Sequence, residues 1–154
     1  ILYAGLMLTD EGPQVIEFNC RFGDPEAQVI LPRLKSDLLE LIISHCNQKQ
    51  HEAHIVFSPD IAITVIIANK GYPGIYQPNS IIRQLDTLSL KSDRFIYHSG
   101  TQRNDKGDII ASGGRVLSIT ATAGTYSAAR KKAYDTVSLI KWENGFYRTD
   151  IGNF

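Results

Sequence analysis

The order of apolar and polar positions at the start of the chain predicts a β-hairpin. Strands are predicted over residues 1–8 and 14–20, and residues 9–13 between them are rich in turn formers. Residues 15–20 alternate in character, which is the period of a half-buried strand. Because successive side chains of a strand point to opposite faces, Ile16, Phe18 and Cys20 should share one apolar face. We expect this face to lie against a core.

Helical spacing and helix-start signals predict three helices. The first covers residues 24–31, with Asp24 as its cap, Pro25 at its first position and Pro32 at its end. The second covers residues 37–46, with Ser36 as its cap. The last runs from residue 125 to about 140. Its apolar face is formed by Ala129, Ala133, Val137 and Ile140.

The middle of the chain predicts a small sheet or barrel-like unit. The β-branched run over residues 61–68 predicts a strand, and shorter strands are expected over 95–98, 108–111 and 115–121. Glycine-containing turns separate them. The polar stretch 47–52 is a plausible domain boundary. The expected fold class is therefore α+β, with one part formed by residues 1–51 and another by residues 52–154.

Composition excludes several classes of protein. The chain has 154 residues, 43% of them apolar, and its 16 basic and 16 acidic residues give a formal net charge of zero. It has no basic excess that would indicate nucleic-acid binding and no apolar run of membrane-spanning length. We therefore expect neither nucleic acid nor membrane as a partner. Two cysteines, Cys20 and Cys46, form no disulfide framework, which favours free, buried thiols in a cytoplasmic protein.

The second face of the return strand carries the candidate chemistry. Glu17, Asn19 and Arg21 alternate with the apolar residues and should share this face. Carboxylate and amide oxygens suit a hard cation such as Mg²⁺, and a guanidinium suits a carboxylate or a phosphate. Gly23 and Asp24 then lead into a helix N-terminus, where anions are favoured. The alternative is a solvated strand face without a ligand.

A second glycine-containing turn precedes the last predicted strand. Gly113, Gly114 and Arg115 resemble a phosphate loop in composition, but the spacing is not that of a Walker motif and a strand follows instead of a helix. The pattern favours a β-turn or a bulge. An Arg115 that faces an active site is the alternative.

Residues 21–28, the signature segment, resemble the signature of the glycinamide ribonucleotide synthetase family of ATP-grasp enzymes. Residues 3–9, 28–32, 69–73 and 113–117 are also similar to that family. The resemblance implies that residues 1–51 are the C-terminal segment of an ATP-grasp domain, formed by a β-hairpin and helices. Residues 52–154 would be a small β-rich domain with a C-terminal helix, and the N-terminal domains would lie upstream.

The resemblance also implies a function for the longer enzyme. Members are ligases that use ATP to join glycine to 5-phosphoribosylamine through a glycyl phosphate, in de novo purine biosynthesis. The implied partners are ATP, glycine, 5-phosphoribosylamine and the missing N-terminal domains, and the 154-residue chain alone should be inactive. Two alternatives remain: another ATP-grasp ligase, or a noncatalytic structural or interaction module.

Two residues of this chain take site roles by the same resemblance, and two more take theirs from their position after that pair. Glu17 and Asn19 match the ligands of Mg²⁺ or Mn²⁺ and so bind the cofactor, with ATP as co-substrate. Arg21 and Asp24 are the candidate catalytic residues. Arg21 would grip a substrate carboxylate or phosphate, and Asp24 would orient glycine or phosphoribosylamine.

Overall fold

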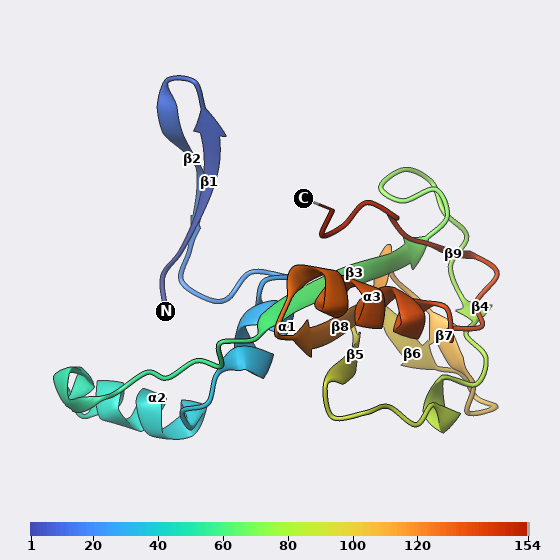
Figure 1. Ribbon diagram of the computed structural model, residues 1–154. Coiled ribbons are helices and arrows are strands. Elements are labelled where there is room, and N and C mark those ends of the chain that lie inside the picture. The colour runs from blue at the N-terminus through green and yellow to red at the C-terminus, as the bar shows by residue number, and fades with distance from the viewer. Residues whose placement is uncertain (154) are drawn as a thin grey trace.

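A β-hairpin, short helices and two antiparallel sheets make up the computed structural model, which describes residues 1–153 without the side chain of residue 50. The hairpin pairs β1 (Tyr3–Thr9) with β2 (Gly12–Asn19). Figure 1 shows it extending away from the rest of the chain, with the N-terminus at its base. The predicted hairpin and the predicted α+β class are both confirmed.

The helical segment after the hairpin differs in detail from its prediction. The first helix, α1, covers only Ala27–Ile30, and it continues into the 3-10 helix η1 (Leu31–Arg33), which contains Pro32. No side chain caps α1. Asp24 is therefore not a helix cap, and its carboxylate has other partners.

The second helix, α2 (Leu38–Cys46), is capped by Asp37, which accepts hydrogen bonds from the N–H groups of Leu39 and Glu40. The prediction of Ser36 as the cap was wrong. Its hydroxyl donates to the carbonyl of His54 and accepts from the N–H of Val56, so it joins two chain segments instead. The 3-10 helix η2 (Gln50–Glu52) follows α2.

The main sheet has four antiparallel strands in the order β5-β8-β3-β9. Its members are β5 (Arg94–His98), β8 (Arg115–Ala123), β3 (Ile61–Asn69) and β9 (Gly145–Phe146). The β-branched run predicted as a strand is β3, which lies at the centre beside β8. Helix α3 (Tyr126–Val137) packs on β3, β5 and β8, and Thr125 caps its start.

A smaller sheet has the order β4-β7-β6. It consists of β4 (Ser80–Ile81), β7 (Ile109–Ala111) and β6 (Thr101–Arg103), and the 3-10 helix η3 (Leu85–Thr87) lies between β4 and β5 in the sequence. Sequence analysis missed β4, β6 and β9. They are two or three residues long, which is too short for a periodic pattern.

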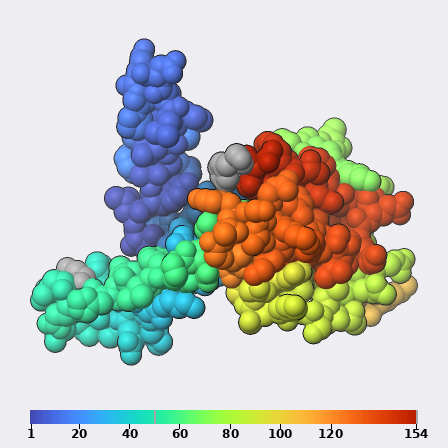
Figure 2. Space-filling view, in the orientation of Figure 1, coloured from blue at the N-terminus to red at the C-terminus, as the bar shows by residue number. Residues whose placement is uncertain are grey.

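The hydrophobic core lies between the main sheet, α3 and the smaller sheet. Val65 of β3 and Leu117 of β8 are fully buried in it, as are Ala129 and Ala133 on the predicted face of α3. Within the described residues, the segment 1–57 contributes no buried hydrophobic side chain. Figure 2 shows the hairpin as a column separate from the core body.

This arrangement overturns one expectation. Ile16 is 62% exposed, Phe18 is 64% exposed, and Cys20 and Cys46 are exposed free thiols. The predicted apolar face does not lie against a core, because no other element within residues 1–153 covers the hairpin. None of the helices among residues 1–153 has both the length and the apolar character needed to cross a bilayer.

Candidate active site

A β-bulge in the hairpin determines which side chains share its polar face. Glu17 pairs with Gly5, whereas the next pair joins Val15 to Leu6, so Ile16 is an extra residue without a cross-strand partner. Cross-strand partners lie on the same face. Phe18, the partner of Ala4, therefore shares its face with Val15, the partner of Leu6. The uninterrupted alternation had predicted that Val15 lies on the opposite face.

Glu17 and Asn19 lie together on the other face. Asn19 donates a 3.0 Å hydrogen bond from Nδ2 to Oε1 of Glu17. The amide oxygen of Asn19 and the second carboxylate oxygen of Glu17 have no hydrogen-bond partner within residues 1–153. Carboxylate and amide oxygens that are accessible to solvent are of the kind that a hard cation binds together with phosphate oxygens. The donor set therefore fits Mg²⁺ or Mn²⁺.

Tyr3 connects this face to the carboxylate of Glu26, which sequence analysis did not assign to the site. Tyr3 is the cross-strand partner of Asn19, and its hydroxyl donates a 3.2 Å hydrogen bond to Oε1 of Glu26. Partial burial, together with the nearby carboxylates of Glu26 and Glu17, raises the pKa of Tyr3. Glu26 was visible within the signature segment, but its contact with the hairpin depends on how the chain turns after β2.

Arg21 is not joined to Glu17 or Asn19 by any described contact. Strand β2 ends at Asn19, so the alternation of faces does not extend to Arg21. The side chain is exposed, and Nη1 donates a 2.8 Å hydrogen bond to the carbonyl of Phe22. Its other N–H groups have no hydrogen-bond acceptor among the described residues, so the guanidinium is available to bind an anion.

Asp24 is bound on both carboxylate oxygens. Oδ1 accepts a 2.7 Å hydrogen bond from Nε2 of Gln28, and Oδ2 accepts a 2.9 Å bond from Nη2 of Arg115. Nη1 of Arg115 also donates a 2.8 Å bond to the backbone carbonyl of Asp24. Arg115 begins β8, so a residue of the main sheet contacts the signature segment. Sequence analysis gave an Arg115 that faces an active site as the alternative. The contact places Arg115 beside Asp24, one of the candidate site residues.

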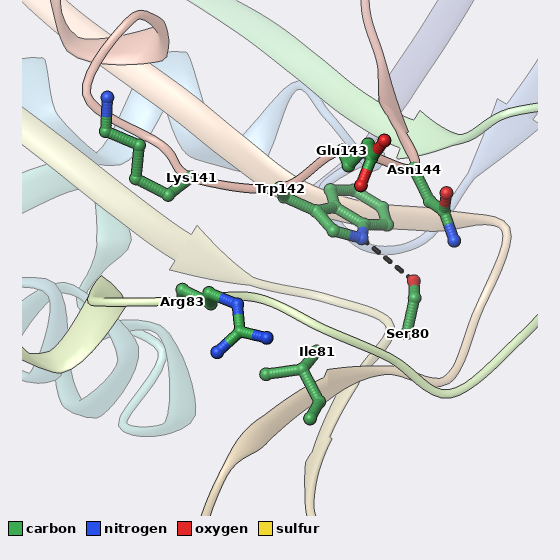
Figure 3. Close-up of a pocket in the computed structure, with 7 residues that line it drawn as sticks. All are labelled: Ser80, Ile81, Arg83, Lys141, Trp142, Glu143 and Asn144. Carbon is green, nitrogen blue, oxygen red and sulfur yellow. Dashed lines mark hydrogen bonds between the residues drawn. The ribbon is translucent and has the colours of Figure 1, made fainter.

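Two cavities, of about 540 and 590 Å³, lie away from these residues. One of about 540 Å³ is lined by Ser80, Ile81, Arg83, Lys141, Trp142, Glu143 and Asn144. In Figure 3 the charged ends of Arg83 and Lys141 point in different directions, and the Trp142 indole N–H donates to the Ser80 hydroxyl. The cations therefore do not converge on one ligand position.

An apolar cavity of about 450 Å³ lies next to the signature segment. Phe22 and Ile30 contribute to it from the segment that leads into and forms α1, and Leu38, Leu41 and Ile42 contribute from α2. Most of its exposed lining is carbon, so it has little polar chemistry of its own. Ile1 before β1 and Phe22 after β2 also line it, so it adjoins the base of the hairpin.

Two family models match the chain. The model described as phosphoribosylglycinamide synthetase, C domain, matches residues 62–154. The model described as phosphoribosylglycinamide synthetase, ATP-grasp (A) domain, matches residues 1–27, a range that contains Glu17, Asn19, Arg21 and Asp24.

Proteins named phosphoribosylamine–glycine ligase are similar along nearly the whole chain. The one from Brucella melitensis is 47% identical over 152 residues, which are 99% of this chain and 35% of the relative. The one from Caldanaerobacter subterraneus is 47% identical over 151 residues, 98% of this chain and 35% of the relative. A relative from Arabidopsis thaliana, named chloroplastic, is 41% identical over 155 residues, 99% of this chain and 29% of the relative.

A solved structure is also similar. The crystal structure of phosphoribosylamine–glycine ligase from Thermotoga maritima matches 97% of this chain and 36% of that chain, with a TM-score of 0.72 and 31% sequence identity. The chain thus spans about a third of the length of the proteins that it matches.

Proposed function

The chain belongs to the phosphoribosylglycinamide synthetase family, and we propose that it is the C-terminal part of a ligase that joins glycine to 5-phosphoribosylamine at the expense of ATP. One observation carries the proposal: the residues matched to the ATP-grasp domain contain Glu17 and Asn19, which are joined by a hydrogen bond on an exposed hairpin face. The boundary near residue 51 stays a prediction, because residues 28–61 lie outside both family matches.

In the proposed reaction, a carboxylate oxygen of glycine attacks the γ-phosphorus of ATP, and ADP leaves. The amine of phosphoribosylamine then attacks the carbonyl carbon of glycyl phosphate, loses a proton and displaces phosphate. Both steps concentrate negative charge on phosphate oxygens. Catalysis of such steps depends mainly on positioning and on charge neutralisation.

Glu17 and Asn19 are the proposed ligands of Mg²⁺ or Mn²⁺. Such a cation would supply positive charge that screens the phosphate oxygens of ATP during transfer. The carboxylate of Glu17 supplies the negative charge, and the Asn19 amide supplies a neutral oxygen. Their mutual hydrogen bond holds the carboxylate on the polar face of β2.

Arg21 and Asp24 are the proposed substrate-contacting residues. The exposed guanidinium of Arg21 has N–H groups free of described partners and so suits the carboxylate of glycine or a phosphate. Asp24 is proposed to orient the amine of glycine or of phosphoribosylamine. Because each carboxylate oxygen has two lone pairs, its bonds to Gln28 and Arg115 leave room for a further donor.

The activity is proposed for a chain longer than these 154 residues. ATP-grasp enzymes hold the nucleotide between two subdomains, and this chain supplies at most one of those walls. The uncovered apolar side chains of the hairpin and of α2 are consistent with further protein packing there. A cytoplasmic location also stays a prediction, since one similar protein is named chloroplastic.

ADP release is the test of this function. The full-length enzyme that contains this chain should release ADP only when glycine and phosphoribosylamine are both present with ATP and Mg²⁺. The 154-residue chain should release none above background under the same conditions. Release that requires bicarbonate or another carboxylic acid instead of glycine would assign the protein to a different ATP-grasp reaction.

A further inference from the structure

Arg115 has a firmly held backbone. Its carbonyl accepts a 3.0 Å hydrogen bond from the N–H of Gly100. The two residues before it are held by Asn69, which is only 1% exposed: Nδ2 donates 2.7 Å to the carbonyl of Gly113, and the backbone N–H donates 2.9 Å to that of Gly114. The base of the Arg115 side chain is thus fixed to the end of β3.

The close approach at Gly100 depends on the absence of a side chain. A Cβ at this position would lie 2.6 Å from the carbonyl oxygen of Arg115 and 2.6 Å from the Cα of Gly113. No rotamer change can relieve a clash with backbone atoms. The sequence around the Gly113–Gly114 turn therefore maintains one position for the start of β8.

The signature segment is held at two acidic residues by different parts of the fold. Arg115 binds both the main chain and the carboxylate of Asp24, while Tyr3 of the hairpin binds Glu26. Gln28 occupies the remaining oxygen of Asp24 from within α1. The segment that these contacts hold also carries the proposed substrate residues, Arg21 and Asp24.

We propose that Arg115 is a positioning residue for the ligase reaction, because it fixes Asp24 and the signature segment against the main sheet. The inference rests on the proposed function. A guanidinium that forks onto one residue constrains both the backbone and the side chain of that residue. Without it, Arg21 and Asp24 would keep their chemistry but lose their fixed placement relative to the main sheet.

Stability is not the main consequence of this contact. The side chains of Arg115 and Asp24 are 39% and 48% exposed, and ion pairs with such exposure contribute little to folding. Neither side chain belongs to the hydrophobic core. Loss of the contact should therefore affect catalysis much more than the melting temperature.

The first test measures amide hydrogen exchange in the full-length enzyme that contains this chain. Arg115→Met should raise exchange in residues 21–28 by about tenfold or more, since a locally opened segment loses protection. Exchange in α3 should not change. Arg103→Met is the matched control, because Arg103 also bridges a carboxylate and a carbonyl, those of Asp86 at 3.0 Å and Gly107 at 2.8 Å.

The second test measures kinetics on the same variants. Arg115→Met should lower kcat by about tenfold to a hundredfold, as expected when reacting groups are misplaced. The KM for ATP should stay within about twofold, because the proposed metal ligands are intact. Arg115→Lys keeps the charge but not the fork, so its kcat should lie closer to that of Arg115→Met than to wild type.

The possible outcomes separate this inference from the proposed function. The exchange experiment would overturn the positioning role if exchange in residues 21–28 did not change in Arg115→Met, or if it rose equally in Arg103→Met. The kinetic experiment would overturn it if Arg115→Met had a normal kcat or Arg115→Lys had full activity. Absence of ADP release by the wild-type enzyme would overturn the proposed ligase function instead. The exchange comparison would then still decide whether Arg115 holds the signature segment.

Discussion

Asn19 donates a 3.0 Å hydrogen bond to the carboxylate of Glu17, two residues earlier on the same face of β2. The bond fixes the direction of both side chains on a hairpin that has no core behind it. Tyr3 extends this face to Glu26 by its own hydrogen bond. The polar face is therefore ordered by its side-chain contacts, and a change at one carboxylate can be made without disturbing the packed core.

Glu17→Gln should reduce activity while leaving the fold intact. In the full-length enzyme, we expect kcat to fall by about 10²-fold or more, as when one preorganised electrostatic contact is removed. Glutamine keeps the size of the side chain but removes the negative charge and a proposed metal ligand. ADP release and the melting temperature should be measured for the Glu17→Gln variant and for the wild-type enzyme.

Glu11→Gln is the control for that experiment, because Glu11 is an exposed carboxylate in the turn of the same hairpin. It should retain wild-type kcat. A Glu17→Gln enzyme with normal activity, or one whose melting temperature falls far below that of Glu11→Gln, would contradict the role of Glu17 as an exposed metal ligand.

Ile16→Asp should be tolerated by the 154-residue chain. Ile16 is the extra residue of the bulge and is 62% exposed, so a carboxylate there remains in water. The free energy of unfolding should change by no more than about 0.5 kcal/mol. Val65→Asp is the comparison: Val65 is fully buried, and an unpaired charge there should prevent folding. Urea titration of both variants checks the contrast, and unfolding by Ile16→Asp would mean that the hairpin packs on the core.

Sequence patterns predicted the elements that residues close together in the sequence determine, and those in which buried side chains recur at a regular spacing. The β-branched run became β3, and the alanine-containing face of α3 is buried as expected. The pairing of Glu17 with Asn19 also followed from strand alternation. These features depend on neighbours in the sequence, which a single chain reveals.

The features that sequence analysis missed depend on distant contacts. Arg115 and Asp24 are 91 residues apart, and nothing in either local pattern indicates that they meet. The bulge at Ile16 leaves the apolar and polar alternation of the sequence unchanged, yet it places Val15 on the face of Phe18. Burial of the hairpin was wrongly expected because an apolar pattern indicates a surface that can be covered, not the element that covers it.

Cys20 and Cys46 should both react in the native 154-residue chain. Each is a free thiol with an exposed position, one just after β2 and the other at the end of α2. Titration with 5,5′-dithiobis(2-nitrobenzoic acid) without denaturant and without reductant should therefore detect two thiols. The variants Cys20→Ser and Cys46→Ser should each remove one reactive group. Reaction only after denaturation would show that the thiols are covered.

Asp93 should make the stability of the chain sensitive to acid. It precedes β5, and its Oδ2 lies 2.6 Å from Nζ of Lys132 in α3. The hydrogen bond to Lys132 is the largest cause that lowers the pKa of Asp93 in the folded chain. Because the folded pKa lies below the unfolded one, this contact stabilises the fold above the unfolded pKa, and the stabilisation is lost as the pH falls through the folded value.

Asp93→Asn should therefore be less stable than wild type near pH 7, and the difference should shrink as the pH falls below the pKa of Asp93 in the unfolded chain. The pair links the edge of the main sheet to α3, so global unfolding reports on it. Free energies of unfolding from urea titrations at several pH values provide the measurement. Asp105→Asn is the control, since Asp105 lies in an exposed turn and its carboxylate has no hydrogen bond or ion pair within residues 1–153. A difference between Asp93→Asn and wild type that stays constant down to pH 2, or one that widens with acid, would contradict the assigned direction of the pKa shift.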